Sequence, residues 1–201
     1  LFADSPLKIY GQIMLPIENN LMANCKREEI QHIYSHPQII AQCRSWLGKN
    51  FHEIQPVEKS SSAVAAEVAA AEPNSAVLGG SLLAEMYGLE LLETSIQDIA
   101  HNTTRFLVIS QETCPPTGND RTSVMFSVRD QPGSLHKALE PFEELDINMS
   151  KIESRPSKRR AWEYYFFVDL AGHCEDDNFA KVIQQLETSC SFVKVLGSYP
   201  A

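Results

Sequence analysis

Residues 121–201 carry a regular alternation of strand and helix signals, and this pattern constrains the fold more than any other feature. Thr122, Val124, Phe126 and Val128 alternate with the residues of the other face and predict a strand. A helix is expected over Ser134–Leu145, after Pro132-Gly133. Two further strands, a helix and a last strand are expected at 147–153, 162–170, 177–189 and 192–196. The order βαββαβ predicts a ferredoxin-like domain, whose crossover connections are right-handed.

The first 112 residues also alternate between strand and helix signals, but less regularly. A strand is expected within Leu7–Ala23, bent at Pro16, and a helix after Pro37 that ends at Gly48. Five more segments follow: an alanine-rich helix capped by Ser60–Ser62, a strand at 76–78, a helix at 82–87 ended by Gly88, and strands at 89–94 and 106–110. The alternation predicts a layered α/β domain. Residues 113–120 contain turn residues without periodicity and are interpreted as a linker.

Composition narrows the classes of partner. The net charge of −9 argues against a nucleic-acid ligand, and the basic run Lys158-Arg159-Arg160 is interpreted as a solvated turn. Five cysteines are scattered without Cys-x-x-Cys or metal-ligand spacing, which favours thiols in a reducing cytosol and predicts no metal or other cofactor. Neither a membrane span nor a signal peptide is indicated. The chain begins at Leu1, which we interpret as a fragment or a processed product.

Two motifs within the βαββαβ pattern resemble a known family. Gly133-Ser134-Leu135 opens the first helix, and Asn148 precedes Glu153-Ser154-Arg155-Pro156. Together they resemble the ACT domains that end prephenate dehydratases. The resemblance implies that the two loops form a site for L-phenylalanine, usually across a dimer interface. It also implies a homodimer or homotetramer. Ser134 and His136 stand where the family often has alanine and a larger apolar residue, which leaves the effector preference open.

The residues themselves suit such a ligand. A glycine before a helix lets backbone N–H groups approach an anion, and the helix N-terminus favours a carboxylate. Glu153 can face an ammonium group or hold its own loop through Arg155. The alternative is that Pro132-Gly133 is only a turn and that Glu153 and Arg155 form a surface ion pair. His136 is interpreted as a helix-surface or interface residue.

A second set of motifs resembles the catalytic domain of the same family. The triplet Thr104-Arg105-Phe106 leads into an apolar strand just before the linker, and Ser35-His36-Pro37-Gln38 is followed by Gln42. The resemblance implies that Thr104 is the main catalytic residue and that Ser35 and Gln42 line the active cleft. Arg105 and Phe106 are expected at the substrate, with Arg105 and helix N-termini holding carboxylates. Alternatively, Ser35 only caps a helix and Arg105 forms a structural ion pair, and His36 and Gln38 are interpreted as structural.

The implied reaction converts prephenate to phenylpyruvate with loss of water and CO2. Aromatisation drives it, so the enzyme mainly orients the substrate and assists departure of hydroxide. A threonine hydroxyl can donate a hydrogen bond to the departing oxygen. The expected architecture is the second lobe of a two-lobed, periplasmic-binding-protein-like catalytic domain, residues 1–112, followed by the ACT domain, residues 121–201.

The first lobe of the family carries a glycine-rich segment and a Val-Glu-Asn-Ser motif, and neither is found at the expected place. We therefore expect exposed apolar surface on Phe106–Ile109 and weak or no dehydratase activity from the isolated chain. Three alternatives stay open: a non-catalytic phenylalanine-sensing fragment or subunit, an arogenate dehydratase, and a periplasmic-type solute binder. A cytoplasmic enzyme regulated by L-phenylalanine is the leading interpretation.

Overall fold

The computed structural model describes residues 2–99, 102–157 and 162–201, and the chain forms two compact units. The middle unit is Leu15–Thr104, and the C-terminal unit combines Leu1–Met14 with Arg105–Ala201. The division thus groups residues 1–14 and 105–120 with the predicted ACT domain. The sequence assigned residues 1–14 and 105–112 to the catalytic part and residues 113–120 to the linker. The basic run at 158–160 lies outside the described residues.

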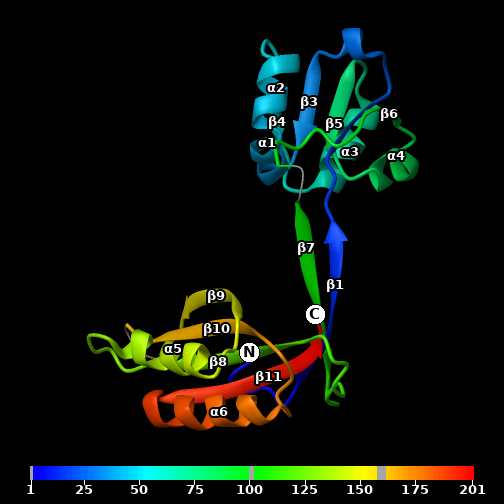
Figure 1. Ribbon diagram of the computed structural model, residues 1–201. Coiled ribbons are helices and arrows are strands. Elements are labelled where there is room, and N and C mark those ends of the chain that lie inside the picture. Colours follow the sequence, from blue (N-terminus) through cyan, green and yellow to red (C-terminus); the bar gives the residue numbers. More distant parts are fainter. Residues whose placement is uncertain (1, 100–101, 158–161) are drawn as a thin grey trace. The chain divides into compact units, whose positions relative to one another are not determined.

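The middle unit is built on a mixed five-stranded sheet of order β4-β3-β5-β2-β6 (Figure 1). Its strands are β2 (Asn20–Ala23), β3 (His32–Ser35), β4 (Val57–Glu58), β5 (Ser75–Gly79) and β6 (Glu90–Glu93). Strand β3 runs parallel to β4 and β5, while β2 is antiparallel to β5 and β6. The helices are η1 (Arg27–Glu29, a 3-10 turn), α1 (Pro37–Gln42), α2 (Arg44–Asn50), α3 (Ser62–Ala71) and α4 (Leu82–Tyr87).

Helices cover both faces of this sheet. Leu21, Ile33 and Leu78 pack with Leu47 of α2 and with Cys43, which lies between α1 and α2. Met22, Tyr34 and Val77 face the other way, against α3 and α4. Successive strand residues point to opposite faces, so neighbours such as Leu21 and Met22 enter different cores. The expected layered α/β architecture is confirmed.

Local signals set several of the helix ends. The Nδ1 atom of His36 accepts a hydrogen bond from the Gln38 amide at the start of α1, and Ser61 Oγ accepts one from Val64 at the start of α3. Gly88 ends α4 in the left-handed conformation, as expected. The prediction at Gly48 was wrong, because α2 continues to Asn50 and the chain instead breaks its helix at Cys43, between α1 and α2.

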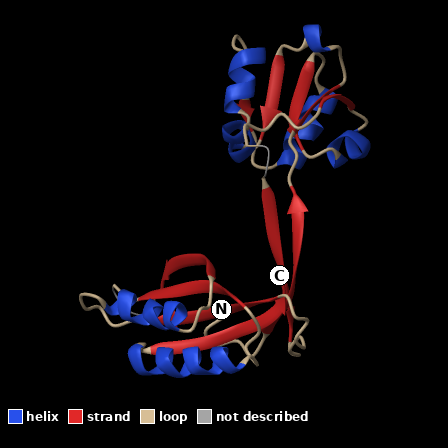
Figure 2. Cartoon of the chain, viewed as in Figure 1, coloured by secondary structure: helices blue, strands red, loops and turns tan. Residues whose placement is uncertain are grey.

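The C-terminal unit contains the expected βαββαβ arrangement. Its elements are β8 (Asp120–Ser127), α5 (Ser134–Glu144), β9 (Met149–Pro156), β10 (Tyr164–Ala171), α6 (Asp177–Ser189) and β11 (Phe192–Pro200). The sheet order is β11-β8-β10-β9, with every neighbouring pair antiparallel. Figure 2 shows the two helices beside the sheet. Phe126, Val168 and Phe179 lie in the core between the sheet and the helices.

The opposite face of this sheet is covered by the start of the chain. Ile9 packs with Met125, Leu196 and Tyr199 in a separate buried cluster. A side chain at Gly197 would collide with the backbone of Ile9, and Gly197 also has a positive φ of 151°. Glycine is therefore required at this crossing for two independent reasons.

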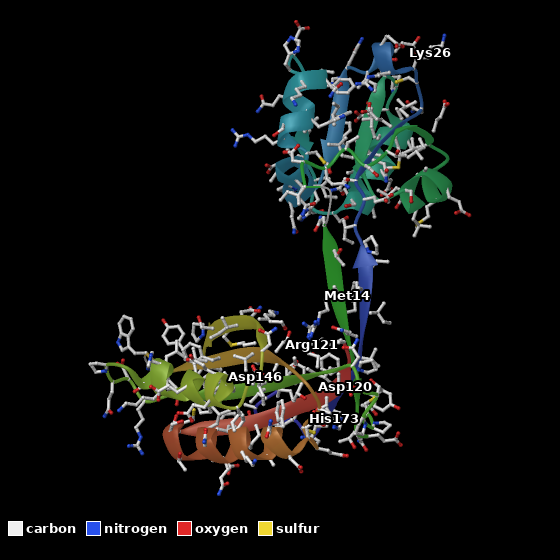
Figure 3. All side chains as sticks on the ribbon, viewed as in Figure 1. Met14, Lys26, Asp120, Arg121, Asp146 and His173 are labelled. Atoms are coloured by element: carbon white, nitrogen blue, oxygen red, sulfur yellow. The ribbon has the colours of Figure 1, made fainter. Side chains whose placement is uncertain are left out.

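Two strands carry the chain between the units. β1 (Lys8–Pro16) pairs with β7 (Thr103–Ser110), and the unit borders fall at Met14/Leu15 and Thr104/Arg105 within these strands. Figure 3 labels Met14 on β1, where its side chain is 53% exposed. The exposed apolar surface expected on Phe106–Ile109 is present, since all four side chains are exposed.

Candidate functional site

A cavity of about 610 Å³ lies within the middle unit, a volume ordinary for a small-molecule site. The end of β1, the N-terminus of β2, helix α1, the turn after β5 and the start of β7 contribute to its wall. The lining residues are Leu15, Pro16, Ile17, Glu18, Asn19, Gln38, Ile39, Gln42, Gly80, Ser81, Leu82, Asn102 and Thr104. The wall combines apolar side chains with hydroxyl and amide groups and one carboxylate, Glu18.

The structure brings two predicted site residues together in this cavity, Thr104 and Gln42. Gln38 also lines it, on the face of α1 that it shares with Gln42 four residues later. The sequence predicts a structural role for Gln38, whereas the structure places it in the cavity wall. His36 instead caps α1.

Asn19 is a site residue that the motifs did not indicate. It is 2% exposed, and its Nδ2 donates a hydrogen bond to Gln42 Oε1 at 3.0 Å, while its backbone N–H donates to Gln97 Oε1 at 2.9 Å. With its oxygen accepting from Asn19, Gln42 retains its own amide N–H groups for a ligand. The segment Ile17-Glu18-Asn19-Asn20 superficially resembles the Val-Glu-Asn-Ser motif of the family's first lobe, but that resemblance assigns Asn19 no role here.

Three residues expected at the substrate do not line the cavity. Ser35 is fully buried and its Oγ donates to the Leu78 carbonyl at 2.8 Å, so its hydroxyl serves the sheet. Phe106 is 52% exposed on β7. Arg105 belongs to the C-terminal unit, where it forms an ion pair with Asp169, in agreement with the structural alternative.

Arg105 takes part in a polar cluster on the C-terminal sheet. Its Nη1 lies 2.5 Å from Asp169 Oδ2, and its Nη2 donates to Tyr199 Oη at 2.6 Å. Burial acts to raise the pKa of Asp169, but hydrogen bonds from Arg105 and Ser123 hold that pKa below its ordinary value. Burial also raises the pKa of the Tyr199 hydroxyl, which therefore stays a neutral donor and acceptor.

A second cavity, of about 240 Å³, lies in the C-terminal unit beside the predicted effector motif. Gly133, Ser134 and Leu135 line it, together with His136, Trp162, Tyr164, Phe166 and residues 128–131. Gly133 has φ 79°, which fits the glycine before the helix. His136 also pairs with Glu140 at 3.1 Å, one turn along α5.

The other half of the effector motif lies outside this cavity. Glu153, Ser154, Arg155 and Pro156 lie on β9, and Asn148, just before that strand, accepts a backbone hydrogen bond from Ala171. Ser154 and Pro156 pair with Phe166 and Tyr164, so they stand one strand away from the cavity wall. Glu153 Oε1 lies 2.5 Å from Arg155 Nη2, and this hydrogen bond, followed by that of Lys151, lowers the pKa of Glu153.

No described residues form a group of three or more His, Cys, Asp and Glu side chains suited to a metal ion. Across the described ranges, no helix is long and apolar enough to cross a membrane.

Fold and cavities together define a class: an α/β lobe with a small-molecule cavity, joined to an ACT-type βαββαβ domain. The family model described as prephenate dehydratase matches residues 1–114, and that of the ACT domain matches residues 122–188. The chain belongs to the prephenate dehydratase family.

Individual relatives agree with this assignment. A bifunctional chorismate mutase/prephenate dehydratase of Aquifex aeolicus is 46% identical over the whole chain, which covers 56% of that protein. A prephenate dehydratase of Lactococcus lactis is 38% identical over 99% of the chain and 74% of the relative. The chain thus spans about half the length of the first curated relatives it matches.

Solved structures extend the comparison. A prephenate dehydratase of Arthrobacter aurescens in complex with L-Phe matches with a TM-score of 0.86 and 30% identity, over 97% of this chain and 66% of that one. A protein described as a quorum-quenching acylase matches with a TM-score of 0.84 and 30% identity, over 97% and 72%.

Proposed function

We propose that the protein containing this chain is a prephenate dehydratase of L-phenylalanine biosynthesis, which forms phenylpyruvate from prephenate with release of water and CO2. The observation that carries the proposal is the convergence of Thr104 and Gln42 on one cavity in a member of this family. The two residues belong to different sequence motifs and are 62 positions apart in the chain. Their presence in the wall of one cavity supports a shared ligand.

The cavity supplies the groups that the reaction requires. The Thr104 hydroxyl donates a hydrogen bond to the oxygen of the ring hydroxyl as it departs as hydroxide with the bonding electrons of its C–O bond. Loss of CO2 supplies the electrons that complete the aromatic ring, and the hydroxide takes a proton from solvent to become water. The Gln42 amide, held through Asn19, donates to a substrate carboxylate and fixes its orientation. Apolar residues such as Ile39 and Leu82 offer a surface for the ring.

The test uses the natural full-length protein that contains these residues and follows phenylpyruvate formation from prephenate. Replacing Thr104 with alanine should lower kcat by about 10²-fold or more, the usual effect of removing a transition-state hydrogen-bond donor. Thr103→Ala is the matched control, because Thr103 is adjacent and does not line the cavity. Equal tolerance of the two substitutions, or no phenylpyruvate at all, would contradict the proposal.

The same assay separates prephenate from arogenate. Glu18 places a carboxylate in the cavity wall, and only arogenate offers an ammonium group in place of the keto oxygen. If arogenate is the better substrate and Glu18→Gln removes that preference, the protein is an arogenate dehydratase. A preference for prephenate that survives Glu18→Gln keeps the original assignment.

An acylase activity is a less economical interpretation of the cavity. Amide hydrolysis through a threonine nucleophile needs a base beside the hydroxyl. The described lining residues include no histidine or lysine, and the carboxylate of Glu18 is their one ionisable group. N-acyl amide substrates in the same assay series would expose such an activity.

We further propose that L-phenylalanine is the effector and binds the C-terminal unit, as the complex of the Arthrobacter relative with L-Phe suggests. The cavity at Gly133–Leu135 and the Glu153–Pro156 segment would form one site across a homodimer or homotetramer. Two observations support this: the motif halves do not share a cavity in one chain, and β9 is an edge strand with Ile152 44% exposed.

A thermal melt of the 201-residue chain tests the effector site. Saturating L-phenylalanine at 100 times its Kd should add about 2.7 kcal/mol of stability, and Glu153→Ala should reduce that shift. Glu144→Ala, an exposed glutamate at the end of α5, should leave it unchanged. No shift with L-phenylalanine, or equal shifts in both variants, would contradict the site.

The remaining assignments rest on sequence alone. We propose that the catalytic part extends over residues 1–112, the linker over 113–120 and the ACT domain over 121–201. We also place the protein in the cytoplasm, a reducing compartment that suits its five free cysteines.

A further inference from the structure

Arg105 differs from the residues around it on β7. Among Thr104–Ile109 it is the one residue that is not exposed, because its guanidinium is held on the C-terminal sheet. The Arg105 side chain is 20% exposed and that of Asp169 is 7% exposed, so their ion pair is largely withdrawn from water. A buried pair is costly to break, since removing one partner leaves the other charge uncompensated.

The ion pair is part of a closed hydrogen-bond network over three strands. Ser123 Oγ on β8 donates to Asp169 Oδ1 on β10 at 2.6 Å, and it lies 2.6 Å from Tyr199 Oη on β11. Tyr199 in turn accepts from Arg105. Each of the four side chains contacts two others in this ring of hydrogen bonds, which makes the network a rigid attachment point for the Arg105 side chain.

Asp169 also stands beside the proposed effector segment. It pairs across the sheet with Lys151 on β9, and Lys151 forms an ion pair with Glu153 at 3.2 Å. The pairing register of β9 and β10 shifts directly after Asp169. Such irregularities re-aim side chains, and a change in β9 at this point would alter the position of the Asp169 carboxylate.

We propose that Arg105 is a positioning residue: its ion pair with Asp169 fixes the start of β7 to the C-terminal sheet and thereby holds Thr104, the next residue, in place. Effector binding along β9 then reaches Thr104 through Asp169 and Arg105. The role of Thr104 in this inference rests on the proposed function, whereas the attachment itself does not. Arg105 acts on the reaction only through its neighbour and touches no reacting atom.

Hydrogen exchange on the 201-residue chain tests the attachment without any assay of activity. Asp169→Asn should speed exchange in peptides covering Thr103–Phe106 by 10-fold or more, and Tyr199→Phe should have a smaller effect. Thr122→Val is the matched control, because it removes hydrogen bonds to Gly172 and Ser198 in the same sheet without touching Arg105. Equal exchange in Asp169→Asn and Thr122→Val would overturn the inference.

Kinetics of the natural full-length protein test the coupling. Asp169→Asn should lower kcat with little change in KM, and it should reduce inhibition by L-phenylalanine at least 5-fold while L-phenylalanine still binds. Arg105→Lys, which keeps the charge, should recover part of the response that Arg105→Met loses. Faster exchange with kcat and inhibition both unchanged would overturn the coupling.

Failure of the proposed function has a different signature. A protein that forms no phenylpyruvate in any variant but shows the exchange pattern contradicts the dehydratase assignment and leaves the attachment standing.

Discussion

Thr104 and Arg105 are consecutive residues, yet they belong to different units and different chemistry. Thr104 lines a cavity of the middle unit, whereas Arg105 is bound by an ion pair to the C-terminal sheet. Adjacent residues of a strand point to opposite faces. The triplet Thr104-Arg105-Phe106 can therefore contribute one residue to the cavity and the next to the C-terminal sheet. The comparison teaches that a short motif need not mark one site, even where the family resemblance is correct.

The largest expected effect is a difference in stability between removing the buried ion pair of Arg105 and removing the neutral side chain of Thr104. Arg105→Ala should lower the free energy of unfolding of the C-terminal unit by about 3 kcal/mol, because Asp169 is left as an unpaired buried charge. Urea unfolding followed by far-UV circular dichroism measures it. Thr104→Ala, at an exposed position, should cost less than about 1 kcal/mol. A similar cost for both would mean that the Arg105 pair contributes little.

Regular patterns in the sequence predicted the fold of the C-terminal unit well. Helix α6 occupies Asp177–Ser189 as expected, and Gly133 precedes α5 with a positive φ. Such features depend on residues close in sequence, which periodicity and turn chemistry can report. The helix break at Cys43 was missed because no proline or glycine marks it.

Tertiary pairings in the candidate sites were beyond the sequence. Nothing in residue type shows that Arg105 meets Asp169, 64 positions away, or that Asn19 meets Gln42. The burial of Ser35 was hidden for the same reason, since a serine before a helix looks the same whether it faces a ligand or a strand carbonyl. Sequence motifs identified Thr104 and Gln42 as cavity residues. The positions of Arg105, Asn19 and Ser35 depend on tertiary packing, which the motifs do not report.

A smaller loss of stability is expected when Asn19, the hydrogen-bond partner of Gln42, is replaced. Asn19→Ala should cost about 1–2 kcal/mol, because it leaves the partly buried amide oxygen of Gln42 without its hydrogen bond. It should also raise KM for prephenate, since Gln42 is no longer fixed. Asn119→Ala, at an exposed site of the other unit, is the control and should change neither quantity. An unchanged KM would show that Asn19 serves only the fold.

The Asp169 carboxylate should also make the stability of the chain depend on pH. The pKa of Asp169 is lowered in the fold, so its contribution to stability is present above the ordinary aspartate range, near pH 3.9, and is lost as pH falls through the folded value. One carboxylate contributes a slope of at most about 1.4 kcal/mol per pH unit. Stability measured between pH 7 and pH 2 should therefore fall less steeply in Asp169→Asn. Parallel curves for both proteins would contradict this assignment.

The smallest effect contrasts two arginines of the same unit. Arg155 pairs with Glu153 at 2.5 Å, the same separation as Arg105 and Asp169, but its side chain is 69% exposed. Water screens such a surface pair, so Arg155→Ala should cost no more than about 1 kcal/mol, and 0.5 M salt should weaken the wild-type pair further. Urea unfolding at low and high salt measures both. A loss as large as that of Arg105→Ala would mean that the Glu153–Arg155 pair is buried in solution, as it would be at a subunit interface that includes β9.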